Sequence, residues 1–484
     1  MPPHAIIAAL QGVLPLAAVL TEPAQLAPYE CDGLSALRER PLAVVLPRTV
    51  SEVRAALVAC HHLGVPVVAR GAGTGLSGGA TPHAQGIVLS LARLNRVLSI
   101  DPLTQTACVE PGVRNLAVSE AAAAFGLYYA PDPSSQIACT IGGNVAENSG
   151  GVHCLKYGLT VHNVRRVTGL LSDGTAVTLG SGGLDSPGLD LLAVGIGSEG
   201  LLLVVTEVLL QLKPRPPVAQ VAMASFDDLG RACQAVADII AAGIIPAGLE
   251  MMDRQATRAV EPFVNAGYDL EAMALLLVEA DGTPEEVTEE MARIDAVLRA
   301  AGATAVTVSQ SEAERLRLWS GRKNAFPAAG RISPDYYCMD GTLPRKQLGA
   351  MLAAMTGMEA RYGLRCMNVF HAGDGNLHPL ILFDANMPGE WARAEAFGAE
   401  ILSLCVRLGG TITGEHGVGL EKIGSMCEQF TPEERAAFFA VRNAFDPTAR
   451  LNPGKALPTL ARCAEFGRQH VHAGQLPHAD LPRF

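Results

Sequence analysis

The sequence predicts an α+β protein of two main domains, and two patterns carry this prediction. Before Arg215-Pro-Pro217, short runs rich in valine and leucine alternate with glycine-rich turns, which is typical of a β-rich domain. After it, strands and helices follow in the order β-α-β-β-α-β, a ferredoxin-like arrangement. With 484 residues, 49% of them hydrophobic, the chain can bury a large core and divide into two or three domains. We place the domains at 1–213, 214–420 and 421–484.

The first domain is expected to start with a helix within Ile6–Leu20 and to continue through short strands. These are Val65–Ala69 and Gly86–Leu91, followed by a hairpin over Val164–Leu179 that turns at Ser172-Asp-Gly174. The second domain is expected to contain two similar cycles. The first comprises Val218–Phe226, a helix over Asp227–Ala242, Ala247–Asp253, Ala272–Glu279, a helix over Pro284–Ala301, and Ala303–Ser309. The second comprises a helix over Leu343–Tyr362, a hairpin, a helix over Trp391–Leu408 and a strand over Thr411–Thr413. The tail after Asn452-Pro-Gly-Lys455, with Cys463, His470 and His472, is expected to wrap the surface.

Charge, cysteine spacing and hydropathy exclude several classes of protein. The net charge of -11 argues against nucleic acid or an anionic membrane as the main partner. The 11 cysteines are never closer than Cys139 and Cys154, so none has iron–sulfur spacing, and we expect reduced thiols in the cytoplasm. No Lys or Arg precedes Arg38, which argues against a signal peptide, and the run Leu201–Leu210 is too short to span a membrane. Contact with a membrane is therefore expected only through a partner.

Two histidines and a following loop predict a metal site. The strand-like segments Met367–His371 and Leu377–Phe383 flank Ala-Gly-Asp-Gly-Asn, a turn sequence, so they form a hairpin that brings His371 and His378 together. Imidazoles suit zinc and related divalent ions, and catalytic sites add a carboxylate while leaving one position open. Glu415 is the expected third ligand. His416, which follows it between Gly414 and Gly417, is the expected base. Ordinary polar loop residues are the alternative.

A glycine-rich loop predicts a nucleotide site. In Arg70-Gly-Ala-Gly-Thr-Gly-Leu-Ser-Gly-Gly79, the spacing matches the dinucleotide fingerprint, but Pro82 and Gly86 intervene before another strand. After the loop, no acidic residue occurs before Asp101. We therefore expect backbone amides that surround a pyrophosphate with no helix behind them, and a surface loop is the alternative. A second glycine-dense passage, Pro131–Gly158, offers close backbone approach and amide donors to a flat ring such as isoalloxazine.

These segments, together with Val109-Glu-Pro-Gly112, Gly197-Ser-Glu-Gly200 and Leu451-Asn-Pro-Gly454, resemble FAD-linked oxidases of the vanillyl-alcohol oxidase superfamily. Within them, the chain is most similar to the family of D subunits of bacterial glycolate oxidases. The most specific matches are Pro28–Ala36, Gly321–Pro327, Ile332–Gly341 and Ala461–Gly467.

The resemblance implies a two-subdomain FAD-binding domain of the vanillyl-alcohol oxidase type, a ferredoxin-like substrate or cap domain, and a C-terminal helical segment that returns to the FAD domain. The implied FAD-binding residues are Pro47, Arg70, Gly71, Ala72, Gly73, Thr74, Gly75, Leu76, Ser77, Pro111, Gly112, Pro131, Asp132, Ser134, Gly142, Gly143, Asn144, Asn148, Gly150, Gly151, Tyr157, Gly158, Glu199, Gly200 and Asn452. Positions 70–80 contain neither His nor Cys, so we expect non-covalent FAD.

The implied reaction is oxidation of glycolate, and of D-lactate, to the 2-oxo acid. The metal would lower the pKa of the substrate hydroxyl, His416 would accept the proton, and the hydride would pass to flavin N5. Arg322 is expected to pair with the substrate carboxylate, and a surface helix arginine is its alternative. Asn376 is expected to orient the hydroxyl, or to serve only the turn.

The resemblance also implies a second FAD-binding subunit and an iron–sulfur subunit as partners, because this chain has no cluster or haem motif of its own. The complex would lie in the cytoplasm, peripheral at the inner membrane. Three alternatives stay open: a stand-alone D-lactate or D-2-hydroxyglutarate dehydrogenase, a metal-dependent hydrolase with a nucleotide-binding domain, and an electron-transfer scaffold with an inactive site.

Overall fold

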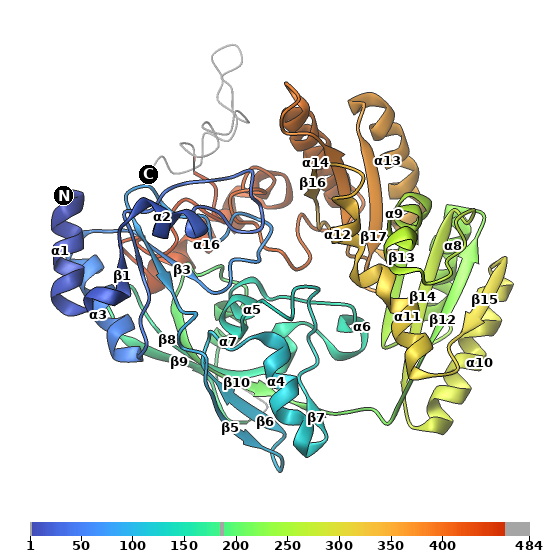
Figure 1. Cartoon of the computed structure of the whole chain (residues 1–484), viewed down its shortest axis with the longest axis horizontal. Coiled ribbons are helices and arrows are strands. Elements are labelled where there is room, and N and C mark those ends of the chain that lie inside the picture. The colour runs from blue at the N-terminus through green and yellow to red at the C-terminus, as the bar shows by residue number, and fades with distance from the viewer. Residues whose placement is uncertain (1, 184–187, 460–484) are drawn as a thin grey trace. The chain divides into compact units, whose positions relative to one another are not determined.

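The structure is a computed structural model that describes residues 2–183 and 188–459. It divides into two compact units. The first takes the described residues of Met1–Ser149, Leu159–Pro214 and Glu415–Phe484, and the second takes Gly150–Gly158 and Arg215–Gly414. Both units mix helices and sheets (Figure 1), so the predicted α+β class is confirmed.

The first unit begins with a four-stranded sheet in the order β1-β2-β4-β3. Strands β2, β4 and β3 are parallel, and β1 is antiparallel to β2. No helix separates β3 from β4, which agrees with the argument against a Rossmann loop. The elements of this part are α1 (Pro3–Val13), β1 (Val19–Leu20), α2 (Pro23–Leu26), β2 (Ala43–Val45), α3 (Val50–Leu63), β3 (Val67–Arg70) and β4 (Ile87–Ser90).

A second sheet of the first unit is antiparallel throughout, in the order β5-β6-β10-β8-β9. The predicted hairpin around Asp173 is confirmed as β8 and β9. The elements are β5 (Val97–Asp101), β6 (Thr106–Val109), α4 (Asn115–Ala122), β7 (Leu127–Tyr128), α5 (Ile141–Glu147), β8 (Val164–Leu170), β9 (Ala176–Gly180), α7 (Leu191–Gly195), β10 (Val204–Gln211) and β11 (Lys213–Pro214), the last paired with β7.

The C-terminal part of the first unit contains α15 (Met426–Gln429) and α16 (Pro432–Phe445). After α16 the chain returns to the first sheet, where Leu451 forms a parallel bridge with Val67. This return brings the 452–455 segment to the loop that follows β3. The rest of the predicted surface tail, from residue 460 on, lies outside the described residues.

The second unit is built on one seven-stranded antiparallel sheet in the order β15-β12-β14-β13-β17-β18-β16. The two cycles predicted from the sequence therefore share one sheet, because β13 pairs with β17. Its strands are β12 (Val218–Phe226), β13 (Gly248–Asp253), β14 (Ala274–Gly282), β15 (Ala305–Val308), β16 (Asp335–Cys338), β17 (Arg365–Phe370) and β18 (Pro379–Phe383).

Helices α10, α8, α13 and α14 pack side by side in a row along this sheet. Helix α10 shows why these residues form helices: the Thr283 side chain accepts a hydrogen bond from the Glu286 amide, the Glu286 side chain accepts one from the Thr283 amide, and Pro284 occupies the first turn. The helices of this unit are α6 (Cys154–Tyr157), α8 (Leu229–Ala241), α9 (Arg254–Val264), α10 (Pro284–Ala300), α11 (Glu312–Lys323), α12 (Ala325–Ala329), α13 (Leu348–Tyr362) and α14 (Glu390–Arg407).

Two details of the sequence prediction are wrong. Helix α9 lies between β13 and β14, where two consecutive strands were expected. Asp253 caps it by accepting from the Ala256 amide, and the internal Pro262 hides the helical pattern in the sequence. The expected strand Thr411–Thr413 is reduced to one bridge between Thr411 and Thr342, because Thr413 and Gly414 turn to bond Asp340 instead.

Within the described residues, no helix is long and apolar enough to cross a membrane.

Candidate active site

The hairpin of β17 and β18 brings His371 and His378 together. The His371 amide donates to the Asn376 carbonyl at 3.1 Å, and the Asn376 amide donates back at 3.2 Å, which closes the turn. Gly375 has φ +73, and a Cβ there would also strike the Leu343 carbonyl, so only glycine fits. The two imidazole rings lie 4.9 Å apart between centroids at 81°, and both side chains are buried.

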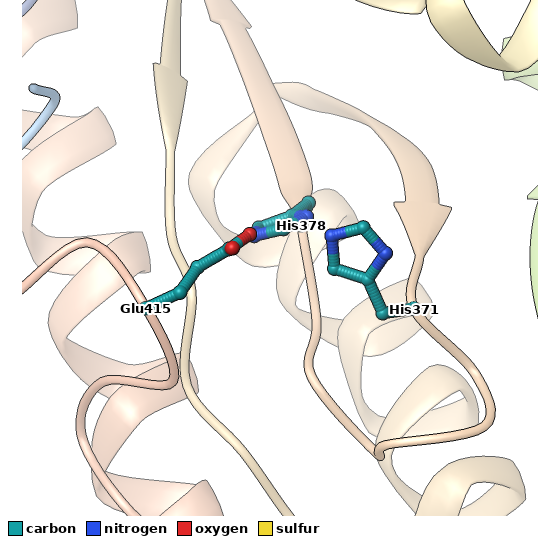
Figure 2. A group of neighbouring side chains, drawn as sticks. All are labelled: His371, His378 and Glu415. Carbon is teal, nitrogen blue, oxygen red and sulfur yellow. The ribbon is translucent and has the colours of Figure 1, made fainter. Parts of the chain in front are cut away.

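Glu415 completes the predicted ligand group. One potential ligand atom from each of His371, His378 and Glu415 lies within 4.8 Å of the others (Figure 2). Glu415 directly follows Gly414, the last residue of the second unit. The Gly414 amide donates to the Asp340 carboxylate at 3.0 Å. Two imidazoles and one carboxylate at this spacing fit a first-row divalent ion.

Asn376 lies against the segment that leads to Glu415. A Cβ on Gly414 would be 2.5 Å from the Asn376 amide carbon, so glycine permits this approach. Among the described residues, the buried Asn376 Oδ1 has no hydrogen-bond partner. An unpaired buried acceptor is costly, and a ligand hydroxyl would satisfy it.

Arg322 is not the surface helix arginine of the alternative interpretation, because its side chain is only 1% exposed. Its Nε donates to Glu250 Oε2 at 2.5 Å, and Glu250 Oε1 lies 2.7 Å from His371 Nδ1. Glu250, which is 121 positions from His371, was not predicted from the sequence. The pairing of β13 with β17 could have revealed this contact. The two strands are antiparallel and Met252 is opposite Val369, so Glu250, two residues before Met252, is opposite His371, two residues after Val369.

A second buried acid, Glu279, lies on the same face of the sheet, because it is opposite Gly248 of β13. It accepts hydrogen bonds from Arg315 at 2.8 Å and from the Trp319 indole, and His153 Nε2 lies 3.3 Å away. Burial acts to raise the pKa of Glu279, but His153, Arg315 and Trp319 together lower it to about 2.

Four residues predicted to contact FAD belong to the second unit: Gly150, Gly151, Tyr157 and Gly158. The Tyr157 hydroxyl donates to Asp281 at 2.7 Å, and Lys156 pairs with the same carboxylate at 2.5 Å. Asp281 on β14 thus holds this segment to the sheet, and it was not predicted.

In the first unit, the predicted pyrophosphate loop follows β3. The Arg70 side chain packs against the loop at Gly73, where a Cβ would strike Nη2, and its Nη1 donates to the Cys31 carbonyl at 2.7 Å. Gly73 has φ +72, a conformation that favours glycine. Ser77 accepts from the amides of Leu420 and Glu421 through its carbonyl, and its buried Oγ has no partner among the described residues. A loop with left-handed glycines and an unpaired hydroxyl fits a phosphate ligand.

The remaining predicted FAD residues of the first unit surround α5 and the preceding loops. Gly142 packs on Pro111, where a Cβ would lie 2.6 Å from the Pro111 Cβ. Two side chains of this group bond within the fold: Asn144 Oδ1 accepts from Asn115 at 3.1 Å, and Asn148 Oδ1 accepts from the Val161 amide at 2.9 Å. Pro47 follows β2, and Pro131, Asp132 and Ser134 lie in the loop between β7 and α5.

Glu199 accepts hydrogen bonds from the amides of Val418 and Gly419, both at 2.7 Å, so its carboxylate faces the loop after His416. Its carbonyl accepts from Asn452 Nδ2 at 2.7 Å, and the same amide nitrogen donates to the Gly79 carbonyl at 3.0 Å. Burial raises the pKa of Glu199. His416 itself belongs to the first unit, and Gly417 beside it has φ +80.

The family model for the FAD binding domain matches residues 41–180, and the model for the C-terminal domain of FAD linked oxidases matches residues 215–456. The chain belongs to the FAD-linked oxidases. It is 60% identical to glycolate oxidase subunit GlcD of Escherichia coli (strain K12) over 99% of this chain and 96% of that protein. It is 32% identical to a D-lactate dehydrogenase of Anaerostipes hadrus over 86% of this chain and 90% of that protein.

Among solved structures, p-cresol methylhydroxylase with substrate bound matches with a TM-score of 0.79 and 19% identity, over 94% of this chain and 96% of that chain. This likeness confirms the predicted fold of the vanillyl-alcohol oxidase type. Membership in the FAD-linked oxidases identifies the chain as a FAD-dependent oxidoreductase, and FAD as its cofactor.

Proposed function

We propose that this chain oxidises glycolate to its 2-oxo acid with FAD and a divalent metal ion. The observation that carries the proposal is the ligand group of His371, His378 and Glu415 in a chain that also matches a FAD-binding domain. The 60% identity to a glycolate oxidase subunit supports glycolate as the substrate. A chelating 2-hydroxy acid would use the open coordination position that such a ligand set leaves.

When bound, the metal supplies Lewis acidity that lowers the pKa of a coordinated hydroxyl, and FAD supplies the hydride acceptor. His416, as a neutral imidazole, would accept the hydroxyl proton. Asn376 Oδ1, unpaired among the described residues, would orient that hydroxyl. Arg322 would hold the carboxylate through Nη1, since its Nε is used by Glu250.

FAD would bind with its pyrophosphate on the backbone of residues 71–77. The left-handed Gly73 and the unpaired Ser77 Oγ support this placement. The Asn452 and Lys455 side chains also reach the Gly79 carbonyl, so the C-terminal segment would brace the loop. We propose that FAD is non-covalent, because positions 70–80 contain no His or Cys.

D-lactate is a second candidate substrate, because a D-lactate dehydrogenase is 32% identical over most of its length. A metal-dependent hydrolase is disfavoured, since both halves of the chain match FAD-linked oxidases.

We also propose partner subunits, a second FAD-binding subunit and an iron–sulfur subunit, which would carry electrons onward and give any contact with the membrane. The name of the 60% identical relative, a subunit, supports membership in a complex. Within this chain no cysteine spacing fits a cluster.

Anaerobic titration of the purified, FAD-loaded protein with glycolate, D-lactate and D-2-hydroxyglutarate would test the proposal. Glycolate is expected to bleach the oxidised flavin spectrum fastest. Failure of all three acids to reduce the flavin would refute the proposed function. Faster reduction by D-lactate than by glycolate would make D-lactate the assigned substrate.

A further inference from the structure

We propose that Glu250 is a positioning residue for the metal site, because it fixes which nitrogen of His371 faces the metal. This inference rests on the proposed function, since it takes His371 as a metal ligand. Glu250 itself touches neither the substrate nor the metal in this account. It acts through the imidazole ring.

The distances around His371 Nδ1 decide its protonation. Glu250 Oε1 lies 2.7 Å from Nδ1, whereas Arg322 Nη2 lies 3.4 Å away. A carboxylate oxygen can approach a ring nitrogen to 2.7 Å only if a proton lies between them. Nδ1 therefore donates to Glu250, and Nε2 is the nitrogen that can bind the metal. A ligating histidine commonly donates its other N–H to a carboxylate in this way.

Arg322 keeps Glu250 in place for this task. Its Nε donates to Glu250 Oε2 at 2.5 Å, and both side chains are only 1% exposed. A buried carboxylate needs such a partner, because an unpaired charge in the interior is costly. The two oxygens of Glu250 are thus divided between the arginine and the histidine.

The experiment compares Glu250→Gln with the matched control Glu279→Gln. Both acids lie on the same face of adjacent strands and pair with arginines of α11, but the histidine beside Glu279 is His153, which is not a predicted metal ligand. Zn²⁺ affinity is measured on the FAD-loaded proteins by competition with a chelator, together with the FAD-to-protein ratio and the melting temperature. Glu250→Gln is expected to weaken Zn²⁺ binding by about 10–100-fold with unchanged FAD content. Glu279→Gln is expected to leave Zn²⁺ affinity unchanged.

The double variant Glu250→Gln with Arg322→Met serves if the single variant does not fold, because it removes both charges of the pair. It should fold and still bind Zn²⁺ weakly. If the folded Glu250 variants bind Zn²⁺ as tightly as the unmodified protein, the inference is overturned. It is also overturned if Glu279→Gln weakens Zn²⁺ binding as much as Glu250→Gln does. His371→Ala separates the two proposals: if it binds Zn²⁺ as tightly as the unmodified protein, the metal site of the proposed function fails as well.

Discussion

Helix α11 places two arginines, seven residues apart, over one face of the seven-stranded sheet, and each pairs with a buried glutamate. Arg315 pairs with Glu279 and Arg322 pairs with Glu250. The third partner differs. Glu279 also holds the Trp319 indole, which packs on the bare Gly248, whereas Glu250 holds the imidazole of His371. The arginine–glutamate pair therefore supports the packing of Trp319 at Glu279 and, in our proposal, a metal ligand at Glu250.

The difference in burial between the two pairs predicts the largest effect on stability. Arg322→Met leaves the enclosed Glu250 carboxylate without its arginine partner, and the free energy of unfolding is expected to fall by about 3–5 kcal/mol. Arg315→Met should cost about 1.5–3 kcal/mol, because Arg315 is 18% exposed and Glu279 keeps Trp319 and His153. Urea unfolding measures both.

Arg317→Met, on the same helix, is the control for these two variants. Its pair with Glu314 is 3.7 Å long and mostly exposed, so it should cost at most about 1 kcal/mol. Equal losses from all three variants would contradict the comparison.

Glu279 also predicts a dependence of stability on pH. Its pKa is about 2 in the folded protein against 4.5 ordinarily, so its contribution is present above pH 4.5 and is lost as the pH falls toward 2. A fall of the pKa from 4.5 to about 2 corresponds to roughly 3 kcal/mol. The advantage of the unmodified protein over Glu279→Gln should therefore be greatest at pH 7 and shrink below pH 4.5. Unfolding measured at several pH values tests this, and a difference independent of pH would show that the ion pairs are not its cause.

Local patterns predicted much of this fold, and long-range pairing explains most of what they missed. The turn of the histidine hairpin and the capped helix over 284–300 follow from neighbouring residues, so they could be read from the sequence. Glu250 could not, since it meets His371 only because β13 pairs with β17 across more than a hundred positions. Helix α9 was missed for a local reason, the proline inside it.

The candidate site divides in the same way. His371, His378 and Glu415 were predicted from motif and spacing, and the structure places their ligand atoms together. Of the acids behind them, Glu250 lies in no matched segment, and Asp340 lies in the matched segment Ile332–Gly341 but was given no role. The contacts of both emerge only from the fold. The catalytic and metal-binding roles of these residues stay predictions.

The most direct test of the account is the metal content and the anaerobic rate of flavin reduction by glycolate in His371→Ala and His378→Ala, with His153→Ala as control. His153 serves the structural acid Glu279 on the same sheet face. Both ligand variants are expected to keep FAD, lose the divalent metal and reduce the flavin more than about 100-fold more slowly, a larger loss than removal of a residue that only supports a ligand. The control should keep its metal and its rate. Full metal content and a native rate in both ligand variants would contradict the central claim.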